Sequence, residues 1–421
     1  MGASGCLHLR DGALHVEDVG LEDLATRFDT PLYVYSRAAL EQGFGAFSSA
    51  FSAARDSLSC YAVKANSSLA VLGVLARRGA GFDIVSGGEL KRVLKAGGAP
   101  SRVVFSGVGK STEDIITALD AGILCFNVES AAELERIAVI AANRGQVAPV
   151  SVRVNPDVDA MSHPYISTGL RENKFGVDME SARALYHRAA SLPSLRVCGI
   201  DCHIGSQITV LSPFVDALDR VLVLVDALAA EGIVLEHIDV GGGLGVSYNG
   251  ETPPTVQAYA AAIIAGVGTR PLRILTEPGR VIVASAGVLL TRVVYLKRNG
   301  ERGFAIVDAG MNDLLRPALY GAWMGIEAVR PRTDESATWD IVGPVCESSD
   351  FLGKQRELAL EAGDLLAVRD TGAYAFSMGS NYNSRGRAAE VMVDGDSAFL
   401  VREREHFEDL VRGERLLPAG V

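Results

Sequence analysis

"SCYAVKANSSLAVLGVLARRGAGFDIVS" (residues 59–86) contains one complete strand–helix–strand unit. Two short β-rich runs, 59–66 and 81–86, flank an Ala- and Leu-rich segment, 68–78, whose apolar residues recur at helical spacing. Strands that are joined by a helix lie parallel in one sheet, because a tight turn connects antiparallel neighbours. This stretch therefore predicts an α/β fold.

The alternation of strands and helices continues as far as residue 280. Six more strand candidates follow the first two, at 103–107, 125–130, 150–156, 197–206, 237–245 and 274–280. Helical patterns separate them, at 88–97, 112–121, 130–144, 178–191, 213–231 and 255–267, and Ser111 and Asp178 supply capping side chains. Eight parallel strands close a (β/α)8 TIM barrel, whereas an open doubly wound sheet is the alternative. No strand is followed by a dinucleotide fingerprint, so we expect the barrel, over residues 36–280.

The pattern changes after residue 280. Strand-like runs follow one another without long helices between most of them, at 281–300, 302–310, 338–346, 365–375, 389–395 and 398–405. Asn299 and Gly300 predict a tight turn between the first two runs. Residues 1–35 also alternate in short strands. We therefore expect 1–35 and 281–421 to form a second, mostly antiparallel β domain.

The composition excludes several classes of partner. The chain has 421 residues and a formal net charge of −11, without a block of Lys or Arg, so we expect no nucleic-acid partner. No apolar run is long enough to span a membrane and no secretory leader is visible, so we expect a cytoplasmic protein without a membrane partner. The six cysteines show no metal-ligand spacing, and five of them lie in apolar runs as small buried hydrophobes. Cys346 is the exception.

Reactive residue types collect where the predicted barrel strands end, which is where barrel enzymes place their active sites. Lys64 ends the first strand, and His203 and Ser206 end the sixth. The triple glycine 241–243 ends the seventh strand, and "EPGR" (277–280) ends the eighth. An amine, glycine amides, a carboxylate and a guanidinium are the groups that hold a phosphorylated cofactor and form a Schiff base with it.

Each of these residues also has a structural interpretation. Burial of Lys64 would lower its pKa toward the neutral amine that a Schiff base requires, whereas a surface lysine would extend its amine to solvent. His203 would stack on a planar cofactor, or it would be a hydrogen-bonded core histidine. Gly241–Gly243 would bind phosphate, or would form an ordinary turn. Glu277 would protonate a pyridine nitrogen and make the ring an electron sink, or would pair with Arg280 on the surface.

The second domain carries three polar clusters of its own, at 307–323, 343–350 and 370–385. The middle one, "GPVCESSD", places the thiol of Cys346 beside the carboxylate of Glu347 in a polar turn. A thiol in such a setting is not typical of an inert core residue, so Cys346 and Glu347 are candidates for a role in chemistry.

Nine motifs together are similar to one known family: "YAVKAN", "FDIVSGGEL", "YISTGLRENKFG", "HIGSQI", "DVGGGLG", "EPGR", "DAGMNDLLRPALYGA", "GPVCESSD" and "DTGAYAFSMGSNYNSRGR". At these motifs the chain resembles the diaminopimelate decarboxylases, pyridoxal 5'-phosphate enzymes of the alanine racemase-like fold type. The resemblance covers nearly the whole chain.

The resemblance implies a role for each candidate residue. Lys64 would carry the cofactor as an internal aldimine, His203 would stack on its ring, and Glu277 would pair with its pyridinium nitrogen. The implied phosphate ligands are Ser206, Gly242, Gly243, Gly279, Arg280 and Tyr374. The implied substrate-binding residues are Arg280, Arg316, Tyr320, Glu347 and Tyr374. Cys346 would return a proton to the substrate carbon.

The reaction implied by the resemblance is decarboxylation of meso-2,6-diaminopimelate to L-lysine and CO2, the last step of lysine biosynthesis. The family is homodimeric, with sites shared between the barrel of one subunit and the β domain of the other. The sequence alone leaves open whether Cys346 and Glu347 act in cis or in trans. A loop at 165–170 is a candidate lid.

Three alternatives remain. A decarboxylase of ornithine or arginine would leave Arg280 and Arg316 without a second substrate carboxylate to bind. A racemase would place an arginine where Glu277 stands. A non-catalytic pyridoxal-phosphate-binding homologue would be expected to lack Lys64 or Cys346, and both are present.

Overall fold

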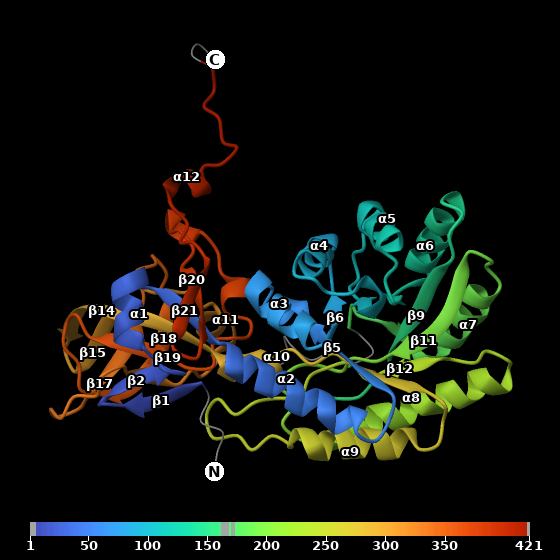
Figure 1. Cartoon of the computed structure of the whole chain (residues 1–421), viewed down its shortest axis with the longest axis horizontal. Coiled ribbons are helices and arrows are strands. Elements are labelled where there is room, and N and C mark those ends of the chain that lie inside the picture. Colours follow the sequence, from blue (N-terminus) through green and yellow to red (C-terminus); the bar gives the residue numbers. More distant parts are fainter. Residues whose placement is uncertain (1–5, 161–167, 170–172, 419–421) are drawn as a thin grey trace. The chain divides into compact units, whose positions relative to one another are not determined.

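The computed structural model describes residues 6–160, 168–169 and 173–418. The chain divides into two compact units (Figure 1). Unit 1 consists of Met1–Ala39 and Ala284–Val421, and unit 2 consists of Leu40–Val283.

Unit 2 is built around a closed parallel barrel. Its strands are β5 (Ser57–Ala62), β6 (Gly81–Ile84), β7 (Val103–Phe105), β8 (Cys125–Val128), β9 (Ala148–Asn155), β11 (Leu195–Asp201), β12 (His237–Asp239) and β13 (Arg273–Thr276). Each strand pairs in parallel with the next, and β13 returns to β5 through the pair Ile274↔Ser57. The two-residue strand β10 (Val177–Asp178) extends the sheet at the end of β9. The predicted TIM barrel is confirmed, and the open sheet is excluded.

Helices separate the barrel strands at the predicted places. They are α3 (Leu69–Arg77), α4 (Gly87–Lys95), α5 (Thr112–Ala121), α6 (Ala131–Asn143), α7 (Met179–Ala190), α8 (Ser212–Ala230) and α9 (Val256–Val267), with α2 (Arg37–Ser52) ahead of β5. Helices α3 to α6 contact one another in chain order around the barrel (Figure 1). Ser111 caps α5 in a reciprocal capping box with Asp114, and Asp178 accepts two backbone N–H groups of α7. No helix of the described ranges combines the length and the apolar character that crossing a membrane requires.

Apolar side chains and thiols of the barrel strands form one buried cluster. The cluster consists of Leu58, Cys60, Val104, Cys125, Cys198 and Leu275. Cys202 is also buried, Cys6 is only partly buried, and Cys346 is exposed. The expectation of five buried cysteines therefore holds for four of them.

Unit 1 is a mostly antiparallel β structure. Its main sheet runs in the order β18-β17-β15-β14-β4-β20-β21, with β16 and β19 attached through β14. These strands are β4 (Leu32–Ser36), β14 (Gly287–Asn299), β15 (Arg302–Val307), β16 (Ile326–Ala328), β17 (Ala337–Val342), β18 (Phe351–Leu358), β19 (Leu365–Val368), β20 (Ala389–Asp394) and β21 (Ser397–Arg402). A small sheet holds β1 (Leu7–Arg10), β2 (Ala13–Val16) and β3 (Val19–Gly20). The predicted hairpin is confirmed, because Asn299 pairs with Arg302.

Two segments differ from the expectation of strands. Residues 281–286 are helical, in α10 (Arg280–Val283) and η4 (Ala284–Ala286), because the carbonyl of Gly279 accepts the backbone N–H groups of Ile282 and Val283. Residues near the N-terminus form α1 (Leu21–Phe28), whose buried Leu21, Leu24 and Ala25 recur at helical spacing. The short helices α11 (Arg316–Tyr320) and α12 (Phe407–Leu410) complete unit 1.

Candidate active site

The glycine-rich turn after β12 has a backbone conformation and a close packing that residues with side chains could not adopt. Gly241 and Gly243 have φ of +66° and +105°, in the left-handed region that favours glycine. A Cβ on Gly242 would collide with the carbonyl oxygen of Glu277, and one on Gly243 would collide with that of Gly205. The turn therefore lies against the loops that follow β11 and β13. Only glycine allows this approach.

The imidazole of His203 is held by this turn. Its Nδ1 accepts the backbone N–H of Gly242 at 3.1 Å and lies 3.9 Å from Oε2 of Glu277. Burial lowers the pKa of His203 well below its ordinary value, and the charges of Arg153 and Lys64 lower it further. The ring is thus neutral and carries its proton on Nε2. Thr168, one of the two described residues of the candidate lid at 165–170, donates its hydroxyl to the His203 carbonyl at 2.9 Å.

Lys64 lies in the 3₁₀ turn η1 (Val63–Ala65), directly after β5. Its Nζ is 2.8 Å from Oδ2 of Asp83, which is the third residue of β6. The Lys64 side chain is 32% exposed, whereas that of Asp83 is 0% exposed. Lys64 is thus partly buried, and a buried carboxylate is its partner, since opposite charges at this distance attract strongly.

Three carboxyl groups gather at the ends of the neighbouring strands. Asp201, Asp239 and Glu277 are buried, and their carboxylate oxygens lie within 4.8 Å of one another. Desolvation raises the pKa of Asp201 to about 7, and it raises the pKa values of Asp239 and Glu277 well above their ordinary range. Mutual repulsion between the carboxylates and repulsion from Asp83 add to these shifts. The cluster therefore retains protons that isolated carboxyl groups would lose.

Arg153 is the buried cation of this region. Its Nη1 lies 3.2 Å from Glu129, and its Nε lies 3.9 Å from Asp201. Arg153 and Lys64 partly compensate the charge of the carboxylates, because both lower the pKa of Asp201. The charged groups form one buried network that connects β5, β6, β9, β11, β12 and β13.

This network predicts a pH dependence of stability. A carboxyl group whose pKa is raised on folding stabilises the protein below its unfolded pKa, and this contribution is lost as the pH rises through the folded pKa. Asp201→Asn should therefore stabilise the cofactor-free protein relative to wild type as the pH rises from 5 to 8, by on the order of 1 kcal/mol or more. Urea unfolding at each pH measures this difference. The exposed Asp216→Asn is the matched control, and parallel curves for wild type and Asp201→Asn would contradict the expectation.

Arg280 begins α10, immediately after Gly279. It is buried, and it donates to the hydroxyls of Ser206 and Tyr248, each at 2.9 Å. Arg280 and Ser206 thus place a cation and a hydroxyl beside the loop of the glycine-rich turn. This is a donor set suited to a phosphate group.

These residues fit pyridoxal 5'-phosphate, the cofactor expected from the sequence. Lys64 offers an amine, and Ser206 and Arg280 offer phosphate donors beside the glycine-rich turn. The buried carboxyl of Glu277 suits a pyridine nitrogen. In this structure the Gly242 N–H is used by His203, so Gly242 orients the imidazole.

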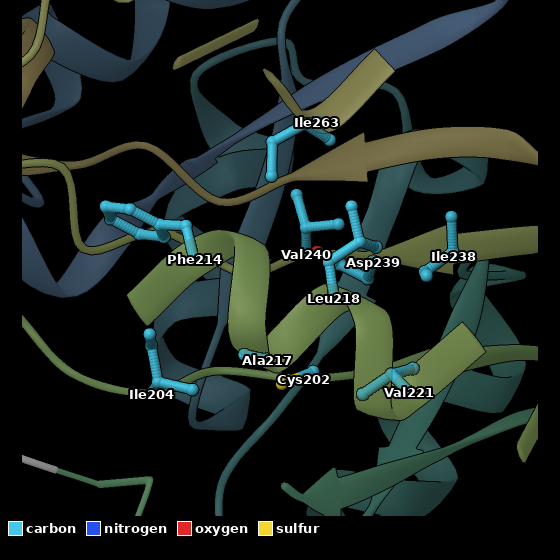
Figure 2. A pocket seen from close by; sticks show the side chains of 10 residues that line it. All are labelled: Cys202, Ile204, Phe214, Ala217, Leu218, Val221, Ile238, Asp239, Val240 and Ile263. Carbon is cyan, nitrogen blue, oxygen red and sulfur yellow. The ribbon is translucent and has the colours of Figure 1, made fainter. Parts of the chain in front are cut away.

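A small cavity of about 20 Å³ lies between the barrel and its outer helices. Phe214, Ala217 and Leu218 of α8, Ile263 of α9 and Cys202 are among the residues that line it (Figure 2). The lining is mostly apolar but includes Asp239, and the space holds little more than one water molecule. It is a packing defect behind the site and is too small for a cofactor.

The turn that carries Cys346 and Glu347 belongs to unit 1. The carboxylate of Asp350 organises it by accepting the backbone N–H groups of Met311 and Val345, both at 2.6 Å. The backbone N–H of Cys346 donates to Oδ1 of Asn383 at 2.8 Å, and Oε1 of Glu347 accepts the hydroxyl of Tyr382 at 2.6 Å. The thiol and the carboxylate are thus presented on an exposed but hydrogen-bonded turn.

The remaining candidate residues also lie in unit 1. Arg316 and Tyr320 are the first and last residues of α11, and Arg316 is buried. Tyr374 has a left-handed backbone with φ of 54°, which is unusual for a residue with a side chain. Such strain persists where surrounding structure holds the residue in place.

Sequence analysis missed several charged and polar residues of unit 2. They are Asp83, Arg153, Asp201, Asp239 and Tyr248. Four of them are charged residues within or at the end of an otherwise apolar barrel strand. A charged residue in an apolar strand could have been recognised as a candidate site residue, since a charge in a buried strand needs a partner. Tyr248 lies in a loop, where the sequence gives no such signal.

The chain is similar to several known proteins. The family described as "Pyridoxal-dependent decarboxylase, pyridoxal binding domain" matches residues 37–284. The diaminopimelate decarboxylase of Pseudomonas aeruginosa is 60% identical over 409 residues, which cover 97% of this chain and 98% of that protein. The enzyme of the same name from Vibrio cholerae is 58% identical over 409 residues, again 97% and 98% of the two chains.

Solved structures give the same result. Diaminopimelate decarboxylase from Helicobacter pylori, complexed with L-lysine, superposes with a TM-score of 0.90 at 46% identity and covers 93% of this chain and 98% of its own. The enzyme from M. jannaschii, also in complex with L-lysine, superposes with a TM-score of 0.95 at 38% identity over 99% of both chains. This chain therefore belongs to the diaminopimelate decarboxylase family of pyridoxal-phosphate-dependent decarboxylases.

Proposed function

We propose that this enzyme decarboxylates meso-2,6-diaminopimelate to L-lysine and CO2. The observation that carries the proposal is the placement of Lys64 and Glu277 in one buried charge network at the carboxyl ends of β5 and β13. The amine of Lys64 and the carboxyl group of Glu277 are the groups that a pyridoxal-phosphate enzyme requires at the two ends of the cofactor ring. Pyridoxal phosphate, when bound, supplies an electron sink for the electron pair released as the carboxylate leaves.

The residues of unit 2, together with Tyr374 of unit 1, would hold this cofactor. Lys64 would bind its aldehyde carbon, and Glu277 would keep a proton at the pyridine nitrogen. The neutral ring of His203, held by Gly242, would lie against the pyridine face. The proposed phosphate ligands are Ser206, Gly243, Gly279, Arg280 and Tyr374.

The residues of unit 1 would select the substrate and complete the reaction. Arg316 and Tyr320, with Arg280, would bind the carboxylate at the end of the substrate that does not react. Glu347 would bind the amine at that end, and the Sγ of Cys346 would donate a proton to the substrate carbon. Each CO2 that leaves is thereby replaced by one proton on the same carbon.

We further propose a homodimer in which Cys346 and Glu347 reach the site from a second copy of the chain. The hydrogen-bonded but exposed turn around Cys346 supports this, because its thiol is available to another molecule. The free cysteines support a reducing compartment such as the cytoplasm.

A substrate panel tests the proposed function. CO2 release is measured from meso-diaminopimelate, L-ornithine and L-arginine, and we expect release from the first alone. Ornithine and arginine lack the second carboxylate that a pair of guanidinium groups would bind. Release from ornithine without release from meso-diaminopimelate would overturn the proposal.

Arg316→Met should raise KM for meso-diaminopimelate far more than it lowers kcat. A hydrogen bond to a charged group contributes about 1.5–3 kcal/mol, which corresponds to a KM increase of roughly 10- to 100-fold. Steady-state CO2 release measures both constants. Arg412→Met, an exposed arginine of the same unit, is the control. An unchanged KM in a folded Arg316→Met enzyme would show that Arg316 does not bind the substrate carboxylate.

A further inference from the structure

Arg356 is a buried arginine in the middle of β18. Arg356 is only 6% exposed, and its guanidinium carbon lies 3.1 Å from the ring centroid of Trp323. Nη2 donates to the carbonyl oxygen of Met324 at 2.9 Å. Nε and Nη1 are buried without a hydrogen-bond partner in the described structure. The principal contacts of the guanidinium are thus the indole ring of Trp323 and the carbonyl oxygen of Met324.

The charge of Arg356 has no counter-ion in the described part of the chain. Among the residues that the structure describes, no carboxylate lies within ion-pair distance of its guanidinium. Burial lowers the pKa of Arg356 to about 10, and no neighbouring charge offsets this shift. A buried cation without a partner destabilises a fold, whereas an apolar side chain of similar volume does not. Stability alone therefore gives no reason for an arginine at this position.

The residues around Arg356 nevertheless fit a guanidinium group. A Cβ on Gly353 would lie 2.5 Å from Nε and 2.9 Å from Nη2 of Arg356, so only glycine leaves room for the group. Trp323, a residue that is 43% exposed, stacks on the guanidinium. A planar guanidinium can stack on an indole face and donate a hydrogen bond in its own plane, which neither lysine nor methionine can do.

Met324 links this arginine to the substrate-binding residues of the proposed function. Its carbonyl accepts from Arg356, and its sulfur lies 3.4 Å from Nη1 of Arg316. Trp323 and Met324 follow α11 after the left-handed Gly321, and α11 carries Arg316 and Tyr320. The strand that carries Arg356 begins at Phe351, directly after the turn with Cys346 and Glu347.

We propose that Arg356 is a positioning residue, which fixes the segment after α11 to β18 and thereby sets the position of Arg316 relative to the Cys346–Glu347 turn. This inference rests on the proposed function, because it assigns Arg316 to the substrate carboxylate. Arg356 itself does not touch the substrate. Its buried Nε and Nη1 are out of reach of a ligand.

Kinetics of Arg356→Met test the inference. We expect KM for meso-diaminopimelate and the Kd of L-lysine to rise roughly tenfold, because a small misplacement of a binding group weakens binding strongly. Turnover at saturation should stay within about twofold, and the cofactor absorbance should not change, since Arg356 is not among the proposed cofactor ligands. Thermal stability should stay the same or rise, because an unpaired buried charge is removed. Arg356→Lys should recover little of the lost affinity.

A matched control is available in the same unit. Arg298 stacks on the other tryptophan, Trp339, at 5.0 Å, but it is exposed on β14. Arg298→Met should leave KM and the Kd of L-lysine at wild-type values. Trp323→Leu removes the stacking partner and should reproduce the Arg356→Met effect. The effects of Arg356→Met and Trp323→Leu should be clearly less than additive in the double variant, because both act on one contact.

Hydrogen exchange separates this inference from the proposed function. Amides of residues 316–324 should exchange faster in Arg356→Met than in wild type or Arg298→Met, whatever the substrate proves to be. Unchanged exchange together with unchanged KM would overturn the positioning role. Faster exchange in a protein that does not decarboxylate meso-diaminopimelate would refute the proposed function and leave the local role of Arg356 standing.

Discussion

Lys64→Ala is expected to reduce CO2 release from meso-diaminopimelate by roughly a thousandfold or more, because it removes the nucleophile that binds the cofactor aldehyde. The structure adds a second reason. Asp83 is completely buried, and its ion pair with Lys64 at 2.8 Å is then lost. The remaining carboxylates would repel one another without the nearby ammonium that now lowers the pKa values of Asp201, Asp239 and Glu277.

The measurement combines single-turnover CO2 release with the visible absorbance of the bound cofactor. The exposed Lys95→Ala on α4 is the control, because it removes the same functional group away from the strand ends. Addition of a small primary amine should restore part of the activity of Lys64→Ala by replacing the missing nucleophile. Turnover near the wild-type rate in Lys64→Ala would refute the role of this lysine.

Mixing two inactive variants is expected to restore activity. Lys64→Ala and Cys346→Ala each lack one essential group, and each should be nearly inactive by itself. If Cys346 of the partner subunit completes the site, a mixed dimer has one intact site and one doubly defective site. Random exchange makes half of the dimers mixed, and one site in two is then intact, so roughly a quarter of the wild-type activity should return.

The experiment requires proof that subunits exchange. Differently tagged variants, co-purified over both tags, provide this proof and also enrich the mixed dimer, whose activity should approach about half of the wild-type value. A mixture of Lys64→Ala with itself under the two tags is the control for tag effects. No recovery in proven mixed dimers would place Cys346 in the same chain as the Lys64 that it serves.

Periodicity predicted the barrel because its strands and helices are regular along the chain. Each of the eight strand candidates became a barrel strand, since runs such as "GFDIVS" are apolar enough to be buried on both faces. Residues 281–286 were expected as a strand for the same apolar composition. The chain is helical there because the carbonyl of Gly279 accepts two N–H groups. The composition of the segment does not reveal this local hydrogen bonding.

The architecture and the residue types at the strand ends could be predicted from the amino-acid sequence, because both depend on spacing along the chain. The pairing of those residues could not, because it depends on how the chain folds in three dimensions. Asp83, Asp201, Asp239 and Glu277 are far apart in sequence, and closure of the barrel forces their carboxylates into one desolvated volume with Lys64 and Arg153. Their protonation depends on the distances between charges and on the exclusion of water, and both arise only when the sheet closes on itself.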